Sequence, residues 1–406
     1  MSLEPPPSDE SGGVMELETA ASTVEVTDSG LVIRWSDGSR SRFHSLWLRD
    51  NCPSGGDKRK AFRTFSIIDL NPELFVIDAE RNDDGDLAVE FSDGHESVFD
   101  FEWLRANSHE PHDRIGTARQ ISHFRAGAVL PEFDLPKRGS AAHCDLLDAV
   151  ARWGVAIVNG VPGDVGGTEM LADLVGRVRE TDFGRLFEIV VEPEVWEFSQ
   201  SGLALDPHTD DPYRYTPSGT SILHCVEVST TGGESVLVDG FGIAVDIRDD
   251  DPDAFDLLTE TRIPFVRHRI ETVEQGEDVH LLAHAPIISL DRDHEIVGIR
   301  FHERSMAPLD IDPSQVGAYY RALITFTKAV NDPGRAVQFR LEPGQAIVYD
   351  NQRVLHGRTA FGSDGGRRHL RLCTIDRDQF HSRLRRLREV HDRPGVLERL
   401  PSGSIA

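Results

Sequence analysis

The sequence contains little cysteine and no long apolar run, and each scarcity excludes a class of protein. Its four cysteines lie far apart and form no C-x-x-C pair, so neither a disulfide framework nor a zinc finger is indicated. No apolar stretch approaches the roughly 20 residues that span a bilayer. The N-terminal segment carries acids and prolines where a signal peptide has basic and apolar residues. We therefore expect a cytoplasmic protein without a membrane partner.

Positive charge is also scarce. The 406 residues include 43 Lys and Arg against 69 Asp and Glu, which gives a net charge of -26. Such an acidic chain is not expected to bind nucleic acid or an anionic membrane. An apolar content of 39% over this length is enough for a substantial core. We expect a globular protein whose partner is a small molecule.

The sequence pattern divides the chain into five segments. Residues 1–20 are rich in Pro, Ser, Gly and Glu, which is typical of a disordered tail. Residues 21–106 show short alternating stretches broken by Ser-Gly or Asp-Gly turns, which predicts a small antiparallel β domain. Residues 107–139 lack periodicity and are predicted as a linker. Residues 140–392 are predicted to form the main domain, and 393–406 a second tail.

Strand patterns dominate the main domain, with helical spacing at 140–154, 167–179 and 313–332. Neither an internal repeat nor a Gly-rich phosphate loop is present. The pattern predicts a mainly β fold with flanking helices, a double-stranded β-helix or jelly roll, and not a βαβ fold. The arginine-rich segment 383–402 carries acids at helical spacing, so we expect a surface or dimer-contacting helix there.

The stretch 205-LDPHTDDPYRY-215 places a histidine and an aspartate two residues apart. Residues i and i+2 of a strand share a face, so His208 and Asp210 would present an imidazole and a carboxylate side by side. The same spacing recurs at His143 and Asp145. That pair lies in a predicted helix, where the two side chains diverge by roughly 200°. We therefore expect His143 to be structural.

A third metal ligand is expected from a later strand. The segment 346-AIVYDNQRVLHGRTAF-361 supplies His356 after an apolar run. Two histidines and one carboxylate leave three positions of an Fe(II) ion open, as in non-haem oxygenases, and these positions suit a bidentate oxoacid and dioxygen. Arg368 lies on the next predicted strand, and its guanidinium suits the far carboxylate of the oxoacid.

At this point the chain resembles the gamma-butyrobetaine and trimethyllysine hydroxylase group of Fe(II)/2-oxoglutarate dioxygenases, within the taurine dioxygenase superfamily. The similarity extends over nearly the whole chain and includes 45-SLWLRDNC-52, 208-HTDDPYR-214, 232-GGESVLVDGF-241, 350-DNQRVLHGR-358 and 375-IDRDQFHSRLRRL-387. The resemblance implies a double-stranded β-helix core, commonly a homodimer, and iron held by His208, Asp210 and His356. It also implies 2-oxoglutarate held by Arg368 and consumed with dioxygen to give succinate and CO2. Because Asp210 is retained, halogenation is not expected.

The N-terminal domain departs from this family. The resemblance implies a structural zinc held by three cysteines and a histidine, and Cys52 and His95 match two of these ligands. Ser54 and Asp57 stand where the other cysteines are expected. One thiolate and one imidazole rarely make a closed tetrahedral site, so we predict no zinc and a buried, apolar role for Cys52.

The substrate pocket departs further. The resemblance implies an aromatic cage that binds a trimethylammonium group through cation–π contacts. Phe183 and Phe187 match two cage positions, but Gln200 and Thr374 stand where tyrosines are expected, and His302 stands where relatives tend to carry asparagine. These three polar side chains form hydrogen bonds, whereas a quaternary ammonium forms none. We therefore expect a small amino acid or amine-type substrate with a primary amine, hydroxyl or carboxylate, and not gamma-butyrobetaine.

Three alternatives stay open from the sequence. Tyr213 or Tyr215 could complete the cage, or the alignment around Gln200 could slip by one residue, and the protein would then be a gamma-butyrobetaine or trimethyllysine hydroxylase proper. The same iron site could catalyse desaturation or C–N cleavage. The protein could also bind metal and 2-oxoglutarate without turnover. Product mass separates the first two outcomes, and succinate release separates both from the third.

Overall fold

The chain divides into two compact units, Met1–Ala118 and Arg119–Ala406. Each unit is described by itself. The structure is a computed structural model, and it describes residues 21–53, 56–57, 62–63, 66–108, 110, 121–190, 202–228, 231–269, 279–291, 294–361 and 367–393.

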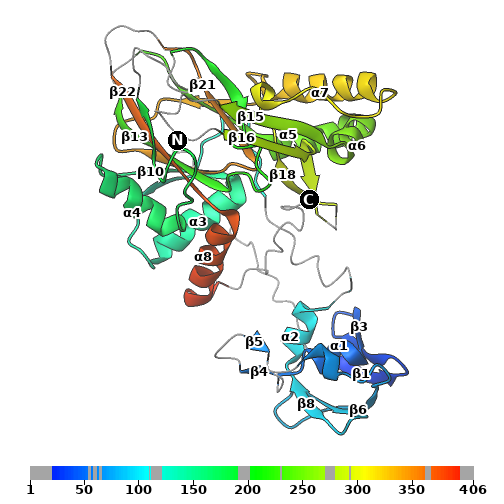
Figure 1. The fold of residues 1–406 in the computed structure, drawn as a ribbon. Helices are drawn as coiled ribbons and strands as arrows, with labels where there is room; N and C mark the ends of the chain where they lie inside the picture. Colours follow the sequence, from blue (N-terminus) through cyan, green and yellow to red (C-terminus); the bar gives the residue numbers. More distant parts are fainter. Residues whose placement is uncertain are drawn as a thin grey trace, which may run out of the picture. The chain divides into compact units, whose positions relative to one another are not determined.

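The first unit contains two three-stranded antiparallel sheets (Figure 1). One sheet has the order β1 (Ala21–Thr27), β2 (Gly30–Trp35) and β3 (Arg40–His44), and the other β6 (Val76–Arg81), β7 (Leu87–Phe91) and β8 (Glu96–Phe99). Two short helices, α1 (Ser45–Asp50) and α2 (Phe101–Ala106), each follow a sheet, and β4 (Gly56–Asp57) pairs with β5 (Phe62–Arg63). Burial alternates along β3, β7 and β8, as the sequence pattern predicts, so one face of each sheet supplies the core.

The predicted remnant of a zinc site lies in this unit. Cys52 is buried, and its Sγ is 3.3 Å from Nε2 of His95. Ser54 and the side chain of Asp57 lie outside the described residues, so the absence of zinc stays a prediction. Burial raises the energetic cost of a charge at His95 and lowers its pKa, with Arg49 acting in the same direction.

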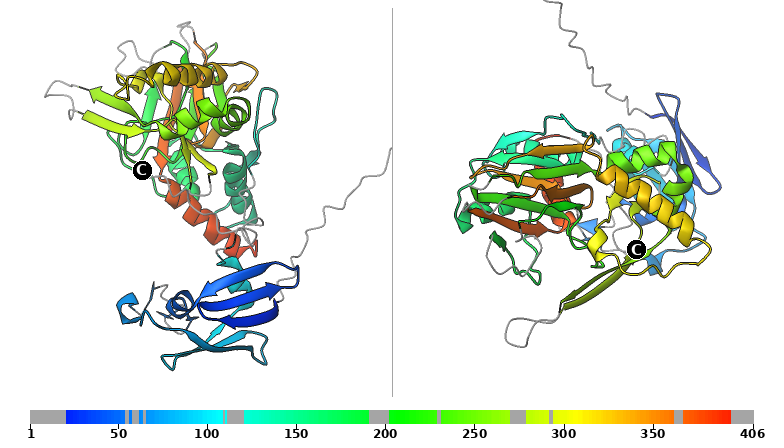
Figure 2. Two further views of the ribbon diagram at one scale, coloured as in Figure 1. Left: turned by 90° about the vertical axis from the view of Figure 1, so that its right-hand side faces the viewer. Right: turned by 90° about the horizontal axis from the view of Figure 1, so that it is seen from above.

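The second unit is built on two β-sheets (Figures 1 and 2). The larger has the order β11 (Phe187–Val190), β22 (Arg368–Ile375), β13 (Thr220–Val228), β20 (Ala346–Asp350), β10 (Val155–Asn159) and β9 (Glu132–Asp134). The smaller has the order β12 (Leu205–His208), β21 (Val354–Arg358), β14 (Ser235–Asp239) and β19 (Ala336–Phe339). One buried cluster joins side chains of both sheets, among them Cys225, Leu237, Tyr349, Val354 and Leu370. This is the predicted jelly roll.

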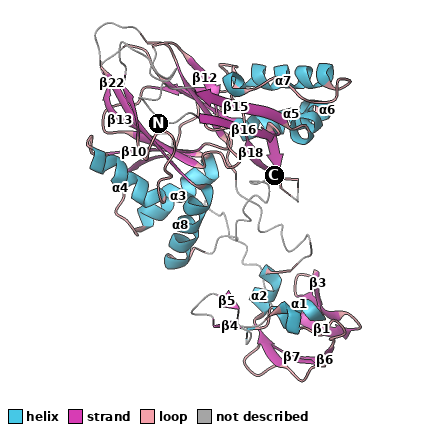
Figure 3. Cartoon of the chain, viewed as in Figure 1, coloured by secondary structure: helices cyan, strands magenta, loops and turns pink. Residues whose placement is uncertain are grey.

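Helices cover the larger sheet on its outer side (Figure 3). α3 (Ala141–Trp153), α4 (Val165–Val175) and α8 (Arg377–Val390) share a buried cluster with β10, β20 and β22. α3 begins at the N-cap Ser140 and ends at Gly154, whose φ of 78° closes the helix. His143 is buried, and its Nε2 lies 2.7 Å from the carbonyl oxygen of Leu174, in the structural role expected of it. None of the helices in the described part of the chain could cross a bilayer.

A second group of helices packs beside the smaller sheet (Figure 2). It contains α5 (Gly240–Asp250), α6 (Pro252–Glu260) and α7 (Val316–Val330), together with the strand pairs β15 (Ile263–Arg269) with β16 (Val279–Ala285) and β17 (Ile288–Leu290) with β18 (Ile296–Ile299). The helix expected at 313–332 is α7. α5 and α6 were not predicted, because their aspartates and the two glycines of α5 resemble loop sequence although both helices have aspartate N-caps.

Two further elements differ from the sequence-based expectations. β9 lies inside the segment predicted as a linker, but it pairs in parallel with β10 at the edge of the larger sheet. The arginine-rich helix begins earlier than expected, at Arg377, and ends at Val390. Its buried side chains include Phe380, Leu384 and Leu387, which pack within the unit. This face is therefore part of the core and not an exposed surface.

A buried ion pair joins the end of β14, at Asp239, to the turn before β21, at Arg353. Arg353, in the turn before β21, donates from Nε and Nη2 to the carboxylate of Asp239 at 3.0 and 2.8 Å, and both side chains are at most 1% exposed. Arg353 also donates to the carbonyl oxygens of Arg152 and Ser122. Burial alone would raise the pKa of Asp239, but Arg353 and His123 outweigh it and hold the pKa at about 2.

We predict that Asp239→Asn lowers the free energy of unfolding by roughly 3–5 kcal/mol at neutral pH, because it leaves the Arg353 charge buried without a counter-ion. The depressed pKa means that the aspartate stabilises the fold above about pH 4 and loses this contribution as the pH falls towards 2. Urea unfolding across this range should show the difference between wild type and variant shrinking by about 2 kcal/mol. A difference that stays constant with pH would contradict the assignment.

Candidate active site

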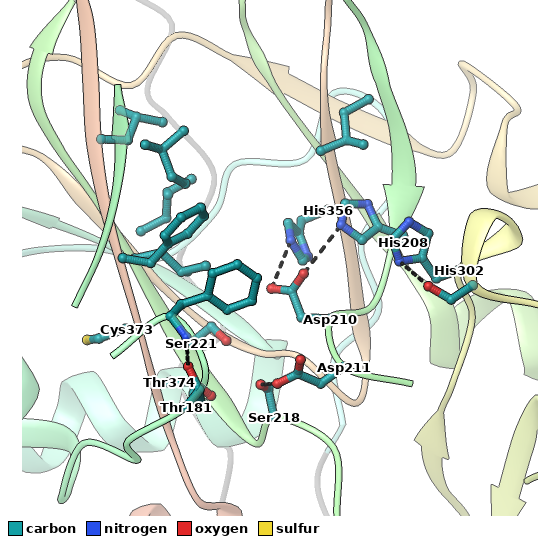
Figure 4. Close-up of a pocket in the computed structure, with 18 of the residues that line it drawn as sticks. Thr181, His208, Asp210, Asp211, Ser218, Ser221, His302, His356, Cys373 and Thr374 are labelled. Atoms are coloured by element: carbon teal, nitrogen blue, oxygen red, sulfur yellow. Dashed lines mark hydrogen bonds and ion pairs between the residues drawn. The ribbon is translucent and has the colours of Figure 1, made fainter. Parts of the chain in front are cut away.

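Two histidines and an aspartate meet where β12 and β21 pair (Figure 4). His208 ends β12 and lies directly opposite His356 of β21 in the antiparallel register. Asp210 follows two residues later, with Oδ1 3.4 Å from Nε2 of His208 and Oδ2 3.4 Å from Nε2 of His356. One ligand atom from each of the three residues lies within 4.8 Å of the others. In the described part of the chain, this is the one cluster of three such groups that could hold a metal.

Neighbouring groups fix the orientation of these side chains. Nδ1 of His208 lies 2.9 Å from the carbonyl oxygen of Asp206 and donates to it, which leaves the Nε2 lone pair free to face Asp210. The side chain of Asn351 accepts from the backbone N–H of Asp210 at 2.8 Å and donates to its carbonyl oxygen at 3.1 Å. Asn351 is fully buried, so it holds the loop after β12 in place.

Asp211 turns the chain immediately after the triad. Its φ of 58° is uncommon for a residue with a side chain, and aspartate tolerates it better than most. The carboxylate accepts hydrogen bonds from the hydroxyl groups of Tyr213 at 2.9 Å and Ser218 at 2.7 Å. These two bonds hold the turn, and they also satisfy the negative charge of Asp211 next to the site.

The protonation states suit a metal. Burial alone would raise the pKa of Asp210, but His356 and His208 outweigh it and hold the pKa well below its usual value. Burial lowers the pKa of His356, against the opposing effect of Asp210. A charged carboxylate and a neutral imidazole are the forms that bind a divalent cation.

Two arginines mark another wall of the cavity. Arg368 is 5% exposed and its guanidinium carbon lies 5.3 Å from the centre of the Phe361 ring, while that of Arg358 lies 4.9 Å from the same ring. Burial lowers the pKa of both to about 10, so both stay charged at neutral pH. Nη1 of Arg368 is buried without a hydrogen-bond partner among the described residues. An orphaned buried donor of this kind fits an incoming carboxylate.

Arg358 was not among the predicted site residues, although the sequence carried a signal for it. It follows His356 by two positions on β21, and residues with this spacing share a strand face. Both line the cavity.

The triad and the arginine wall open into one cavity of about 420 Å³. Phe183, Phe187, His302 and Thr374, predicted to bind substrate, all line it. The rings of Phe183 and Phe187 lie 4.6 Å apart. Thr374 Oγ1 is buried without a partner among the described residues. Gln200, the fifth predicted substrate residue, lies outside the described part of the chain.

His302 lies against the triad, with its ring centre 4.3 Å from that of His208. Burial lowers the pKa of His302 to about 3, so the imidazole is neutral at physiological pH. Its Nδ1 lies 3.4 Å from Oγ of Ser305. A neutral imidazole can both donate and accept a hydrogen bond, so His302 could orient a polar group of a substrate.

The two tyrosines considered as cage members have different positions. Tyr213 lines the cavity, and its hydroxyl accepts from Nη1 of Arg267 at 3.3 Å. Tyr215 is 81% exposed and does not line this cavity, so it cannot complete the cage in this structure. Arg267 was missed by the sequence reasoning, because no local motif indicates that β15 reaches the aromatic pair.

Sequence and structure comparisons identify relatives over most of the chain. Residues 117–374 match the taurine catabolism dioxygenase TauD, TfdA family, and residues 23–105 match the gamma-butyrobetaine hydroxylase-like N-terminal family. The chain is 34% identical to gamma-butyrobetaine dioxygenase from Pseudomonas sp. (strain AK-1), covering 88% of this chain and 93% of the relative. It is 30% identical to mitochondrial trimethyllysine dioxygenase from Gallus gallus, covering 88% and 86%. A solved taurine dioxygenase from Burkholderia xenovorans aligns with a TM-score of 0.46 at 16% identity, over 63% of this chain and 91% of that chain.

Proposed function

Because the chain belongs to the taurine catabolism dioxygenase TauD, TfdA family, we propose that it is an Fe(II)- and 2-oxoglutarate-dependent dioxygenase that hydroxylates a small amino acid or amine-type substrate. The observation that carries this proposal is the convergence of His208, Asp210 and His356 in a cavity that also contains Arg368. These four residues supply a metal site and a carboxylate site in one chamber.

The residues fit the proposed cofactors. Two imidazole nitrogens and one carboxylate form the donor set of non-haem Fe(II) oxygenases, which leaves positions for an oxoacid and dioxygen. Iron bound by His208, Asp210 and His356 would supply the activation of dioxygen, coupled to conversion of 2-oxoglutarate to succinate and CO2. The unpartnered Nη1 of Arg368 supports a role in binding the far carboxylate of 2-oxoglutarate.

Other residues of the chain would orient these groups. Asn351 holds the backbone of Asp210, and the carbonyl oxygen of Asp206 fixes the tautomer of His208. The guanidinium groups of Arg358 and Arg368 both lie near the Phe361 ring, so Arg358 would add a second positive charge where 2-oxoglutarate is proposed to bind. His302 and Thr374 would offer hydrogen bonds to the substrate, and the aromatic pair would pack against its carbon chain. Together these contacts would hold the substrate in one orientation near the metal and exclude part of the water from the cavity.

A second candidate is a gamma-butyrobetaine or trimethyllysine dioxygenase proper. The names of the relatives and the retained pair Phe183 and Phe187 favour it. Turnover assays with the two trimethylammonium compounds would distinguish it from the proposed function. Rapid hydroxylation of either would replace our substrate class with theirs.

Succinate release tests the proposed activity. We expect protein loaded anaerobically with Fe(II) to release succinate from 2-oxoglutarate once oxygen is admitted, slowly alone and faster with one compound from a panel of small amino acids and amines. Product mass then gives the reaction: one added oxygen marks hydroxylation, and loss of two hydrogens marks desaturation. Complete absence of succinate in all conditions would favour a binding protein without turnover. A homodimer and a cytoplasmic location remain expectations for this enzyme.

A further inference from the structure

A guanidinium group of the chain itself covers one of the two aromatic rings at the proposed substrate end of the cavity. The guanidinium carbon of Arg267, on β15, lies 4.4 Å from the centre of the Phe183 ring and 5.7 Å from that of Tyr213. Phe183 and Arg267 both line the cavity. Arg267 therefore already occupies one cation–π position on Phe183.

Arg267 is held in this position from two sides. Its Nη2 lies 3.3 Å from Oδ2 of Asp182, and its Nη1 donates to the hydroxyl of Tyr213 at 3.3 Å. The side chain is 15% exposed. A guanidinium with these contacts is unlike a mobile surface arginine, and displacing it from the ring would break an ion pair and a hydrogen bond.

Asp182 and Asp211, the two described aspartates near the Phe183 ring, are already paired with arginines. Arg214 pairs with Asp182 and lies 3.4 Å from Asp211, so Arg214 and Arg267 balance the charges of these two aspartates. Asp211 also accepts the hydroxyl groups of Tyr213 and Ser218. The other acid among the described residues that line the cavity is Asp210, the proposed metal ligand. Among the described residues, a trimethylammonium group would find one face of the Phe183 ring covered and no unpaired carboxylate beside it.

Groups that suit an anion are present at the same end. Arg185 lies between Phe183 and Phe187 in the chain, lines the cavity, and forms no ion pair or hydrogen bond among the described residues. Thr374 follows Cys373, and its buried Oγ1 lacks a partner among the described residues. Arg185 and Thr374 therefore both line the cavity that contains the aromatic pair.

We propose that the substrate presents an anionic group, a carboxylate, to the end of the cavity formed by Phe183, Phe187, Arg185, Arg267 and Thr374. The carboxylate accepts from Arg185 and from the Thr374 hydroxyl, and Arg267 excludes a quaternary ammonium from the Phe183 ring. This inference rests on the proposed function and narrows its substrate class to amino acids that carry a second acid group.

Three probes that share an amino acid head and a four-methylene chain would test the inference. The first is Nε-trimethyllysine, the second is α-aminopimelate, in which a carboxylate replaces the trimethylammonium group, and the third is the uncharged tert-butyl analogue. Their dissociation constants would be measured by calorimetry on the anaerobic protein with Fe(II) and 2-oxoglutarate bound. We expect aminopimelate to bind about tenfold more tightly than the tert-butyl analogue, and trimethyllysine to bind most weakly.

Substitutions would show which residues cause the predicted order of dissociation constants. Arg185→Gln, at an exposed position, should weaken aminopimelate binding by about tenfold and leave the tert-butyl analogue within about twofold. Arg267→Gln should improve trimethyllysine binding, and Arg267→Lys should retain the preference for the anion. Arg248→Gln, on α5 and outside the cavity, is the matched control and should change none of the constants.

Tighter binding of trimethyllysine than of aminopimelate by the wild type would overturn the inference. So would equal losses for all three probes in Arg185→Gln, or the failure of aminopimelate to bind at all. Succinate release without any added substrate reports the proposed function independently of these constants. A protein that releases succinate but prefers trimethyllysine would therefore disprove only the anionic substrate.

Discussion

Replacing Asp210 with alanine is expected to reduce succinate formation by at least about a thousandfold, because it removes the proposed metal ligand that carries charge. Asp210 bridges the space between His208 and His356, with both oxygens 3.4 Å from an imidazole nitrogen. Two neutral imidazoles alone would hold Fe(II) weakly. Iron content per chain after gel filtration would fall with activity, which separates loss of metal from loss of a later step.

The matched control for Asp210→Ala is Asp310→Ala. Asp310 is an exposed aspartate that pairs with His284 and does not line the cavity. We expect this variant to keep wild-type iron content and succinate formation. Full activity in Asp210→Ala, or equal losses in both variants, would contradict the assignment of Asp210 as a ligand.

Arg368→Gln is expected to raise the KM for 2-oxoglutarate by about a hundredfold, with a smaller change in kcat. A charge-assisted bidentate pair contributes roughly 1.5–3 kcal/mol, and glutamine cannot supply either the charge or the fork. Arg368 is buried beside Phe361, so no water-exposed arginine can take its place easily. Steady-state kinetics at varied 2-oxoglutarate concentration would measure both constants.

The neighbouring arginine supplies the control for this substitution. The side chain of Arg367 is 75% exposed and lies 3.6 Å from Glu227, away from the cavity lining. Arg367→Gln should leave the KM for 2-oxoglutarate unchanged. An unchanged KM in Arg368→Gln would move the oxoacid site elsewhere, and Arg358 would then be the next candidate.

Local patterns in the sequence were sufficient for many elements. Ser140 and Gly154 mark the ends of α3, as their sequence positions predict. The expectation that His208 and Asp210 share a strand face was wrong in its reason, because β12 ends at His208 and Asp210 lies in the loop that follows. Local spacing could not place His356 opposite His208, because strand pairing across a long stretch of chain is set by the whole fold. The resemblance to a known family supplied that contact, and the structure brings the residues together.

Other features had no local signal at all. Arg267 reaches Phe183 because the β15 and β16 pair lies beside the cavity, and no motif near Phe183 indicates this. α5 and α6 were missed because their sequences combine helix caps with residues typical of loops. The buried pair of Arg353 and Asp239 was likewise invisible, since an arginine and an aspartate are expected on surfaces unless they are paired.

The most direct test of the central claim is the visible absorption spectrum of the protein with Fe(II) and 2-oxoglutarate under anaerobic conditions. Chelation of the iron by the oxoacid should produce a charge-transfer band that requires both components. We predict that the wild type shows this band, that Asp210→Ala lacks it, and that Arg368→Gln shows it only at much higher 2-oxoglutarate concentration. A wild-type protein that binds Fe(II) and 2-oxoglutarate without the band would contradict a shared site at His208, Asp210 and His356.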